Sequence, residues 1–119
     1  MDSYDLKSKT KLFAIDIIKF IKMLSNNYME MTIAKQLLDQ LRSWQQIYRA
    51  ACRSRSKSEF FAKLSIVVEE TDETMFSLEL LIESKITDSA IAKNLLERAT
   101  EFIKIFSKAR KTVSMQLKT

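Results

Sequence analysis

Not one glycine or proline occurs among the 119 residues of this chain. Since these two residues form most sharp turns and interrupt helices and strands most strongly, a chain without them has few ways to build tight strand turns, phosphate-cradling loops or left-handed helix ends. Most of the residues that remain are good helix formers, chiefly Leu, Ala, Lys, Glu, Met and Arg. The sequence therefore predicts an all-α fold.

Histidine is absent too, and this removes much of the chemistry that enzymes use. The chain has no imidazole base, no histidine metal ligand and no partner to activate Cys52 as a nucleophile, so Cys52 is expected to be a small buried side chain. Glu69 and Glu73 lie four residues apart on a helix, but di-iron bundles also need Glu-x-x-His motifs. Without glycine, neither a P-loop nor a Rossmann fingerprint is present. We expect no enzymatic activity, no cofactor and no metal site.

The single cysteine, Cys52, cannot form an intramolecular disulfide, which favours a reducing, cytoplasmic compartment. The first five residues lack the basic and long apolar regions of a signal peptide. No apolar run approaches the ~20 residues that a membrane span needs. We therefore expect a cytoplasmic protein that does not contact a membrane.

Apolar residues recur at helical spacing in four segments separated by polar breaks. The first two segments run from about residue 7 to 25 and from about 29 to 53, and Asn27 with Glu30 resembles a capping box between them. A polar stretch at 54–58 precedes the third, with Ser56 and Glu59 as a second candidate box. Another break at 84–88 precedes the fourth, and either Thr87 or Asp88 is the expected cap. The stripes consist of Phe13, Ile17, Phe20 and Leu24; Leu37, Leu41, Trp44, Tyr48 and Ala51; Phe60, Leu64, Val67, Thr71, Met75, Leu78 and Ile82; and Ile91, Leu95, Ala99, Phe102, Phe106, Ala109 and Val113.

Four stripes joined by short breaks predict one domain over residues 1–119, an antiparallel up-down-up-down four-helix bundle. Trp44 and Tyr48 suit either its core or an interface. Apolar residues also lie off the main stripes, namely Ile15, Met23, Ile66 and Phe76. Such second faces favour a homo-oligomer.

Charge is sorted along the chain rather than mixed, although the net charge is only +5. Residues 42–57 carry only basic charges, and residues 58–84 are mostly acidic. Arg42, Arg49 and Arg53 are spaced to share one helical face, and Arg55 and Lys57 follow in the predicted loop. Such a cluster suits phosphate binding. It also suits two other roles, covering the C-terminal end of a helix dipole or pairing with the acidic third helix.

Several stretches resemble a known family over roughly residues 5–113. They are Phe13-Ala14-Ile15-Asp16-Ile17-Ile18-Lys19, Lys35-Gln36-Leu37-Leu38, Tyr48-Arg49-Ala50-Ala51-Cys52-Arg53-Ser54-Arg55-Ser56-Lys57-Ser58-Glu59-Phe60, Ala62-Lys63-Leu64, Val68-Glu69-Glu70-Thr71-Asp72-Glu73-Thr74 and Leu78-Glu79-Leu80-Leu81. This pattern resembles the bacterial four-helix-bundle proteins named for 23S ribosomal RNA intervening sequences. The chain departs from the family pattern at Ser43-Trp44-Gln45-Gln46-Ile47, where related sequences usually have small residues and then Asn.

The resemblance implies an antiparallel bundle that assembles as a ring-shaped homopentamer, with no established enzymatic activity. It also implies a link to RNA, because a related protein is the basic accessory factor of diversity-generating retroelements, which works with a reverse transcriptase. The positions that match the basic motif are Arg49, Arg53, Arg55 and Lys57, and these are the candidate nucleic-acid-binding residues. Two hypotheses follow: an oligomer that binds RNA or another polyanion through this cluster, and a protein-interaction scaffold with no nucleic-acid role.

Overall fold

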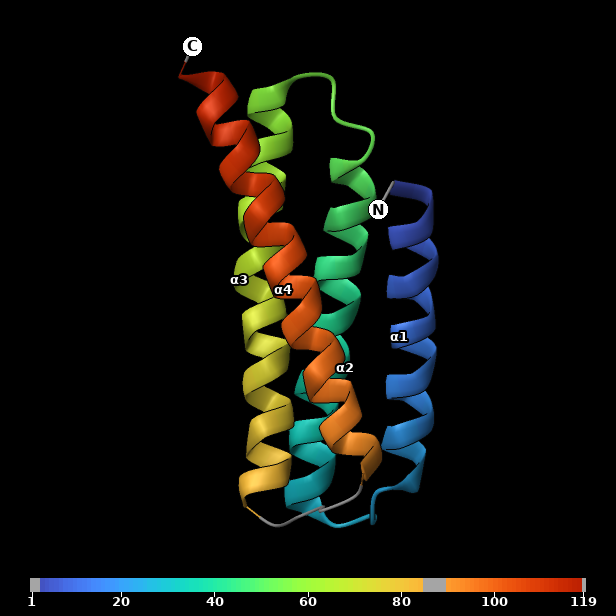
Figure 1. Ribbon diagram of the computed structural model, residues 1–119. Helices are drawn as coiled ribbons and strands as arrows, with labels where there is room; N and C mark the ends of the chain where they lie inside the picture. Colours follow the sequence, from blue (N-terminus) through green and yellow to red (C-terminus); the bar gives the residue numbers. More distant parts are fainter. Residues whose placement is uncertain (1–2, 85–89, 119) are drawn as a thin grey trace.

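The computed structural model describes residues 3–84 and 90–118, and these residues form four helices (Figure 1). The helices are α1 (Ser3–Met23), α2 (Tyr28–Ala51), α3 (Lys57–Glu83) and α4 (Ala90–Leu117). They lie side by side in a rod about 51 Å long and 22 Å across. No strand occurs among the described residues, so the all-α prediction is confirmed.

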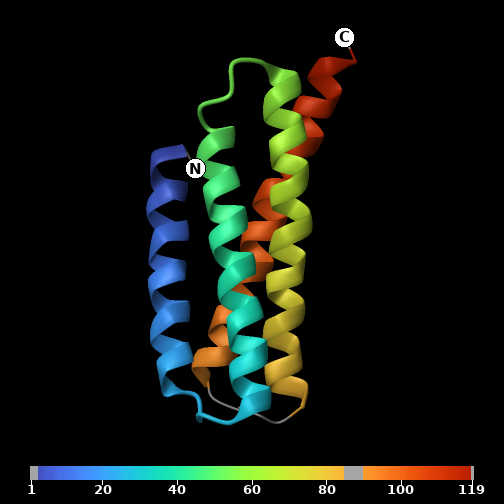
Figure 2. The same ribbon diagram turned by 180° about the vertical axis from the view of Figure 1, so that it is seen from behind.

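The helices alternate in direction and follow one another around the rod, as Figures 1 and 2 show from opposite sides. Each of α1 and α3 packs against both α2 and α4, so the diagonal pairs are α1 with α3 and α2 with α4. This is the predicted up-down-up-down bundle. Its topology brings the start of α1, the end of α2, the start of α3 and the end of α4 to one end of the rod.

Two of the helix starts use the caps that the sequence predicts. The Glu30 backbone N–H donates to Oδ1 of Asn27 at 2.8 Å, and the Glu59 N–H donates to Oγ of Ser56 at 3.1 Å. Both capping residues have extended backbone angles, as an N-cap requires. The third predicted cap, Thr87 or Asp88, lies outside the described residues.

The core is built around aromatic rings from α1, α2 and α4. Phe13 meets Phe102 edge to face with ring centroids 5.3 Å apart, and Trp44 meets Phe106 in the same way at 5.6 Å. Tyr48 packs on Phe106 at 5.2 Å. Trp44 and Tyr48 are therefore core residues of the bundle. Most other stripe positions are buried or partly buried around them.

Several details of the prediction are wrong. Ile91, predicted as core, is 44% exposed, because it lies in the first turn of α4 beside a groove that α1 leaves open. Helix α2 ends at Ala51 instead of Arg53, since the Arg53 N–H bonds back to the Ala50 carbonyl in a tighter turn. Lys57 belongs to α3 instead of the loop, because Ser56 caps the helix immediately before it. Cys52, expected to be buried, is only partly buried because it follows the last residue of α2.

Candidate nucleic-acid interface

Basic residues gather at the end of the rod where α2 connects to α3. We call this the basic end: the first half of α1, the second half of α2, the α2–α3 connection, the first half of α3 and the second half of α4 (Figure 1). Its cations are Lys7, Lys9, Lys11, Arg42, Arg49, Arg53, Arg55, Lys57, Lys63, Lys104, Lys108, Arg110, Lys111 and Lys118. Its described acidic residues are Asp5, Glu59, Glu69 and Glu70. The basic end therefore has a large positive net charge.

The opposite half of the rod has the reverse balance. Its described cations are Lys19, Lys22, Lys35, Lys93 and Arg98. Its described acidic residues are Asp16, Glu30, Asp39, Asp72, Glu73, Glu79, Glu83, Glu97 and Glu101. The net charge of +5 thus combines a strongly positive end with a negative one.

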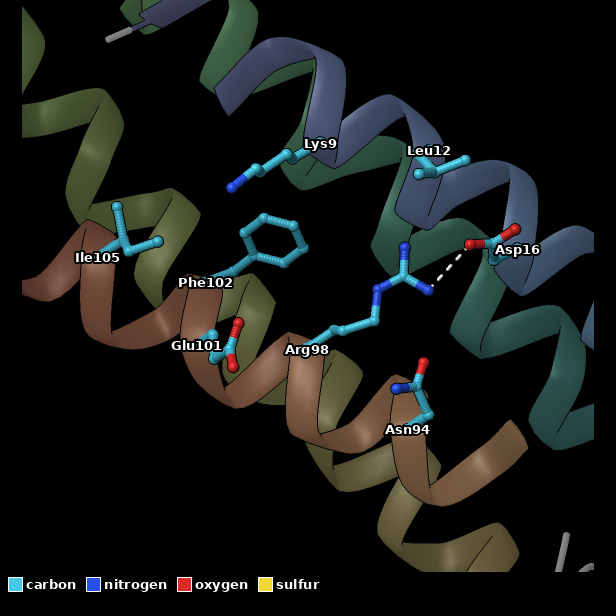
Figure 3. A pocket seen from close by; sticks show the side chains of 8 residues that line it. All are labelled: Lys9, Leu12, Asp16, Asn94, Arg98, Glu101, Phe102 and Ile105. Carbon is cyan, nitrogen blue, oxygen red and sulfur yellow. Dashed lines mark hydrogen bonds and ion pairs between the residues drawn. The ribbon is translucent and has the colours of Figure 1, made fainter. Parts of the chain in front are cut away.

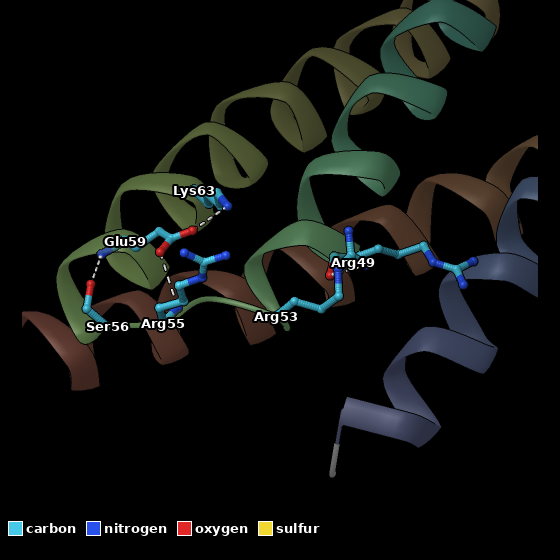
Figure 4. A network of polar contacts seen from close by, with 6 residues as sticks. All are labelled: Arg49, Arg53, Arg55, Ser56, Glu59 and Lys63. Atoms are coloured by element: carbon cyan, nitrogen blue, oxygen red, sulfur yellow. Dashed lines mark hydrogen bonds and ion pairs between the residues drawn. The ribbon is translucent and has the colours of Figure 1, made fainter.

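The four predicted binding residues lie around the α2–α3 connection, and all are exposed. Figure 4 shows three of them, Arg49, Arg53 and Arg55. Arg49 is in the last turn of α2, Arg53 and Arg55 are in the connection, and Lys57 is the first residue of α3. Nη1 of Arg53 donates to the Arg49 carbonyl at 3.2 Å, so Arg53 satisfies one of the free carbonyls at the end of α2. A guanidinium has five N–H donors, so this bond leaves Arg53 with others to offer.

Glu59 is the acidic residue beside this cluster, and its carboxylate is already engaged. It accepts a 2.7 Å bond from Nζ of Lys63 and a 3.2 Å bond from the Arg55 backbone N–H. The Lys63 bond, helped by the Arg55 N–H, lowers the pKa of Glu59 below its ordinary value. Between described residues, ion pairs join Lys63 to Glu59 and Arg98 to Asp16, so neither pair involves Arg49, Arg53, Arg55 or Lys57.

A shallow hollow of about 320 Å³ adjoins the cluster between α1 and α2. Arg42 and Arg49 both line it, and Figure 4 shows the Arg49 side chain extending toward α1. Nearby, Nε2 of Gln45 donates to the Thr10 carbonyl of α1 at 2.6 Å. The Gln45 side chain thus ties α2 to α1.

Sequence reasoning missed a second feature, the groove between α1 and α4 (Figure 3). Two hollows of about 450 Å³ each share Asp16, Asn94 and Arg98 and so form one continuous groove. Nη1 of Arg98 reaches across it to Oδ2 of Asp16 at 2.9 Å, and the Arg98 guanidinium lies 5.3 Å from the centre of the Phe13 ring. The rest of the groove wall includes exposed apolar side chains, among them Leu12, Met23 and Ile91.

The described part of the chain offers little to other kinds of chemistry. Within residues 3–84 and 90–118, no three Cys, Asp or Glu side chains gather as a metal site would require. None of the described helices is apolar over enough of its length to cross a bilayer. Burial, followed by the bond to Cys52, raises the pKa of Tyr48, so this phenol stays protonated.

The chain resembles a solved structure, a protein of unknown function from the S23 ribosomal protein family of Bacteroides thetaiotaomicron. The two share 30% sequence identity and superpose with a TM-score of 0.82, over 93% of this chain and 99% of the other. No family model matches the chain, and no curated protein matches it either.

Proposed function

Given that this chain belongs to the S23 ribosomal protein family, we propose that it is a non-enzymatic, oligomeric bundle that binds RNA or another polyanion through its basic end. Arg49, Arg53, Arg55 and Lys57 form the centre of the site. The neighbour's own function is unknown, so the proposal rests on the chemistry of this chain.

One observation carries the proposal: cations from every helix meet at one end, and no ion pair between described residues involves the side chains of the four central ones. Like charges held together repel one another, so an unneutralised cluster has a cost that a bound polyanion removes. Phosphates would displace counterions and bring Arg and Lys into charge-assisted hydrogen bonds. The first amides of α3, next to Lys57, add the positive end of a helix dipole.

The likeness to 23S ribosomal RNA intervening sequence proteins supports RNA as the polyanion and a homopentamer as the assembly. A ring would repeat the basic end in each subunit, so a second contact with the same RNA becomes intramolecular. Affinity should then rise with RNA length. Sequence preference should be slight, because phosphate contacts carry no base information. A reverse transcriptase is a candidate protein partner on the same likeness.

The test is a double reversal of charge, Arg53→Glu with Arg55→Glu, in the full chain. RNA retention in a low-salt gel shift should be lost while helicity and oligomer mass stay as in the parent. The matched control is Lys22→Glu with Lys93→Glu, which makes the same change in net charge on exposed residues of the opposite half. That control should still bind RNA.

The alternative function is a protein-interaction scaffold, and the apolar groove between α1 and α4 favours it. The two functions differ in salt dependence. Polyanion binding weakens steeply as salt rises, whereas apolar contacts do not. If the parent fails to bind RNA at low salt, or the basic-end double variant binds as well as the parent, the scaffold function is the better one.

A further inference from the structure

A second basic hollow lies at the basic end, on the seam between the start of α3 and the end of α4. Its volume is about 510 Å³, and it is open to solvent. Figures 1 and 2 show the start of α3 and the end of α4 side by side. Its lining residues are Phe61, Ser107, Arg110, Lys111, Ser114, Met115 and Lys118. The α4 residues recur at steps of three and four, so they share one face of that helix. No acidic residue is among them.

The helix dipole explains only one of the three cations of this hollow. Lys118 directly follows the last residue of α4, where a cation stabilises the negative end of the dipole, and this effect is confined to the end of the helix. Arg110 and Lys111 lie further back, and neither is in the ion pairs that join described residues. Three cations and two hydroxyls therefore converge on one concave surface, a set of donors that suits phosphate oxygens.

Phe61 gives the hollow an aromatic wall. Its neighbour Phe60 packs against the buried core, but Phe61 is only partly buried and lies outside the core and the residues packed on it. A phenyl ring beside unpaired cations is the arrangement by which proteins bind single strands, because bases stack on the ring while phosphates meet the charges. In a duplex the faces of the bases are stacked on one another and are not free to stack on a ring.

We propose that this hollow is a subsite for one nucleotide of single-stranded RNA, with the base against Phe61 and Met115 and the phosphate on Arg110, Lys111 and Lys118. The inference rests on the proposed function and adds to it: the charge cluster at Arg49–Lys57 holds the backbone of any RNA, and the Phe61 hollow selects unpaired strands.

The experiment compares an oligouridylate of about 12 nucleotides, within the usual site sizes of single-strand binders, with an RNA duplex of the same length. Affinity is measured by fluorescence anisotropy with the full chain. Phe61→Ala and Phe61→Leu should weaken oligouridylate binding by roughly 5- to 100-fold, and change duplex binding by less than about twofold. Neither Phe61 variant should change how steeply RNA affinity falls with salt concentration. Arg110→Gln with Lys111→Gln should instead reduce the salt slope by roughly 0.7 for each phosphate that the variant no longer neutralises.

The control is Phe76→Ala, which removes a more exposed ring of α3 about 22 Å along the same helix. It should bind both RNAs as the parent does. Phe61→Leu keeps an apolar side chain at the partly buried site, and light scattering of each variant shows whether the assembly is intact. In addition, an oligonucleotide carrying a photoreactive uridine should cross-link to the segment that contains Phe61.

The outcomes separate the two proposals. If both Phe61 variants bind oligouridylate as the parent does, or if cross-links fall elsewhere, the subsite is wrong and the charge-based function stands. If the Phe61 variants lose oligomer mass, the hollow is a contact between protein chains and the subsite is likewise wrong. A parent that binds the duplex but not oligouridylate at low salt overturns the subsite alone, and a parent that binds neither overturns both proposals.

Discussion

The indole N–H of Trp44 in α2 donates a 3.2 Å hydrogen bond to Oγ1 of Thr74 in α3, inside the core. Both side chains are fully buried. The same threonine hydroxyl donates to the Glu70 carbonyl of its own helix at 3.2 Å, so it accepts one bond and makes another. The buried indole N–H of Trp44 is thus satisfied by a polar partner on the facing helix.

Thr74→Val should destabilise the protein by about 1–3 kcal/mol, because valine keeps the shape but leaves the buried Trp44 N–H without an acceptor. Urea unfolding followed by circular dichroism measures this. Thr71→Val is the matched control: Thr71 is equally buried, but its hydroxyl bonds only to the Val67 carbonyl of its own helix. Thr71→Val should lower the free energy of unfolding by less than Thr74→Val does. Equal losses from the two variants would contradict the importance of the Trp44 bond.

The carboxylate of Glu59 should make stability depend on pH. Its folded pKa lies below the ordinary value of 4.5, so its contribution is fully present above pH 4.5 and is lost as pH falls through the folded pKa. In thermal melts, the parent should exceed Glu59→Gln in stability above that pH, and the difference should shrink on acidification. Ser56→Ala removes an uncharged cap and should cost about 1 kcal/mol with little pH dependence. If the difference in stability between the parent and Glu59→Gln grew as the pH fell, the lowered pKa of Glu59 would be refuted.

Helix α1 should exchange its amide hydrogens faster than α2 and α3. Hollows lie along both of its seams, and its backbone approaches its neighbours less closely than the other helices approach one another. Elements with looser packing open at lower free energy. Hydrogen–deuterium exchange with mass spectrometry resolves the four helices by peptide. Equal protection in α1 and α3 would show that the groove does not weaken the attachment of α1.

The assembly should be a homo-oligomer, so light scattering at micromolar concentration should give a multiple of 13.9 kDa, five subunits on the family likeness. We expect the groove between α1 and α4 to be the contact surface. Leu12→Glu, at a groove residue that is 53% exposed, should leave the helicity unchanged and reduce the mass. Met29→Glu changes a residue of α2 that is 61% exposed and does not line the groove, and this variant should keep the parent mass. A parent mass near 13.9 kDa would refute the prediction.

The fold could be predicted from the sequence because its determinants are local. Apolar spacing indicates the buried face of each helix, and Asn27 and Ser56 mark two helix starts. Periodicity gives the direction of a side chain but not the distance to the next helix. For this reason the pattern predicts Ile91 in the core, although α1 lies too far away to cover it.

The candidate site was only partly predictable. The cluster at Arg49–Lys57 is contiguous in sequence and visible there. The cations of α1 and α4 join it only because alternate helices run in opposite directions, which is a property of the whole chain. The apolar spacing places Phe60 on the core-facing stripe and Phe61 off it, but it does not show that the end of α4 forms a basic hollow around Phe61.

The unequal charge of the two ends gives the molecule a permanent electric dipole along its longest axis. Such a dipole turns a rod in the field of a charged partner before the two make contact. A polyanion would therefore collide mostly with the end where α2 connects to α3, and fewer collisions would fall on the sides of the rod. This orientation takes place before contact, so it changes the association rate constant. The association rate constant should fall as salt is added, because at 0.1 M ionic strength the field is screened beyond about 10 Å.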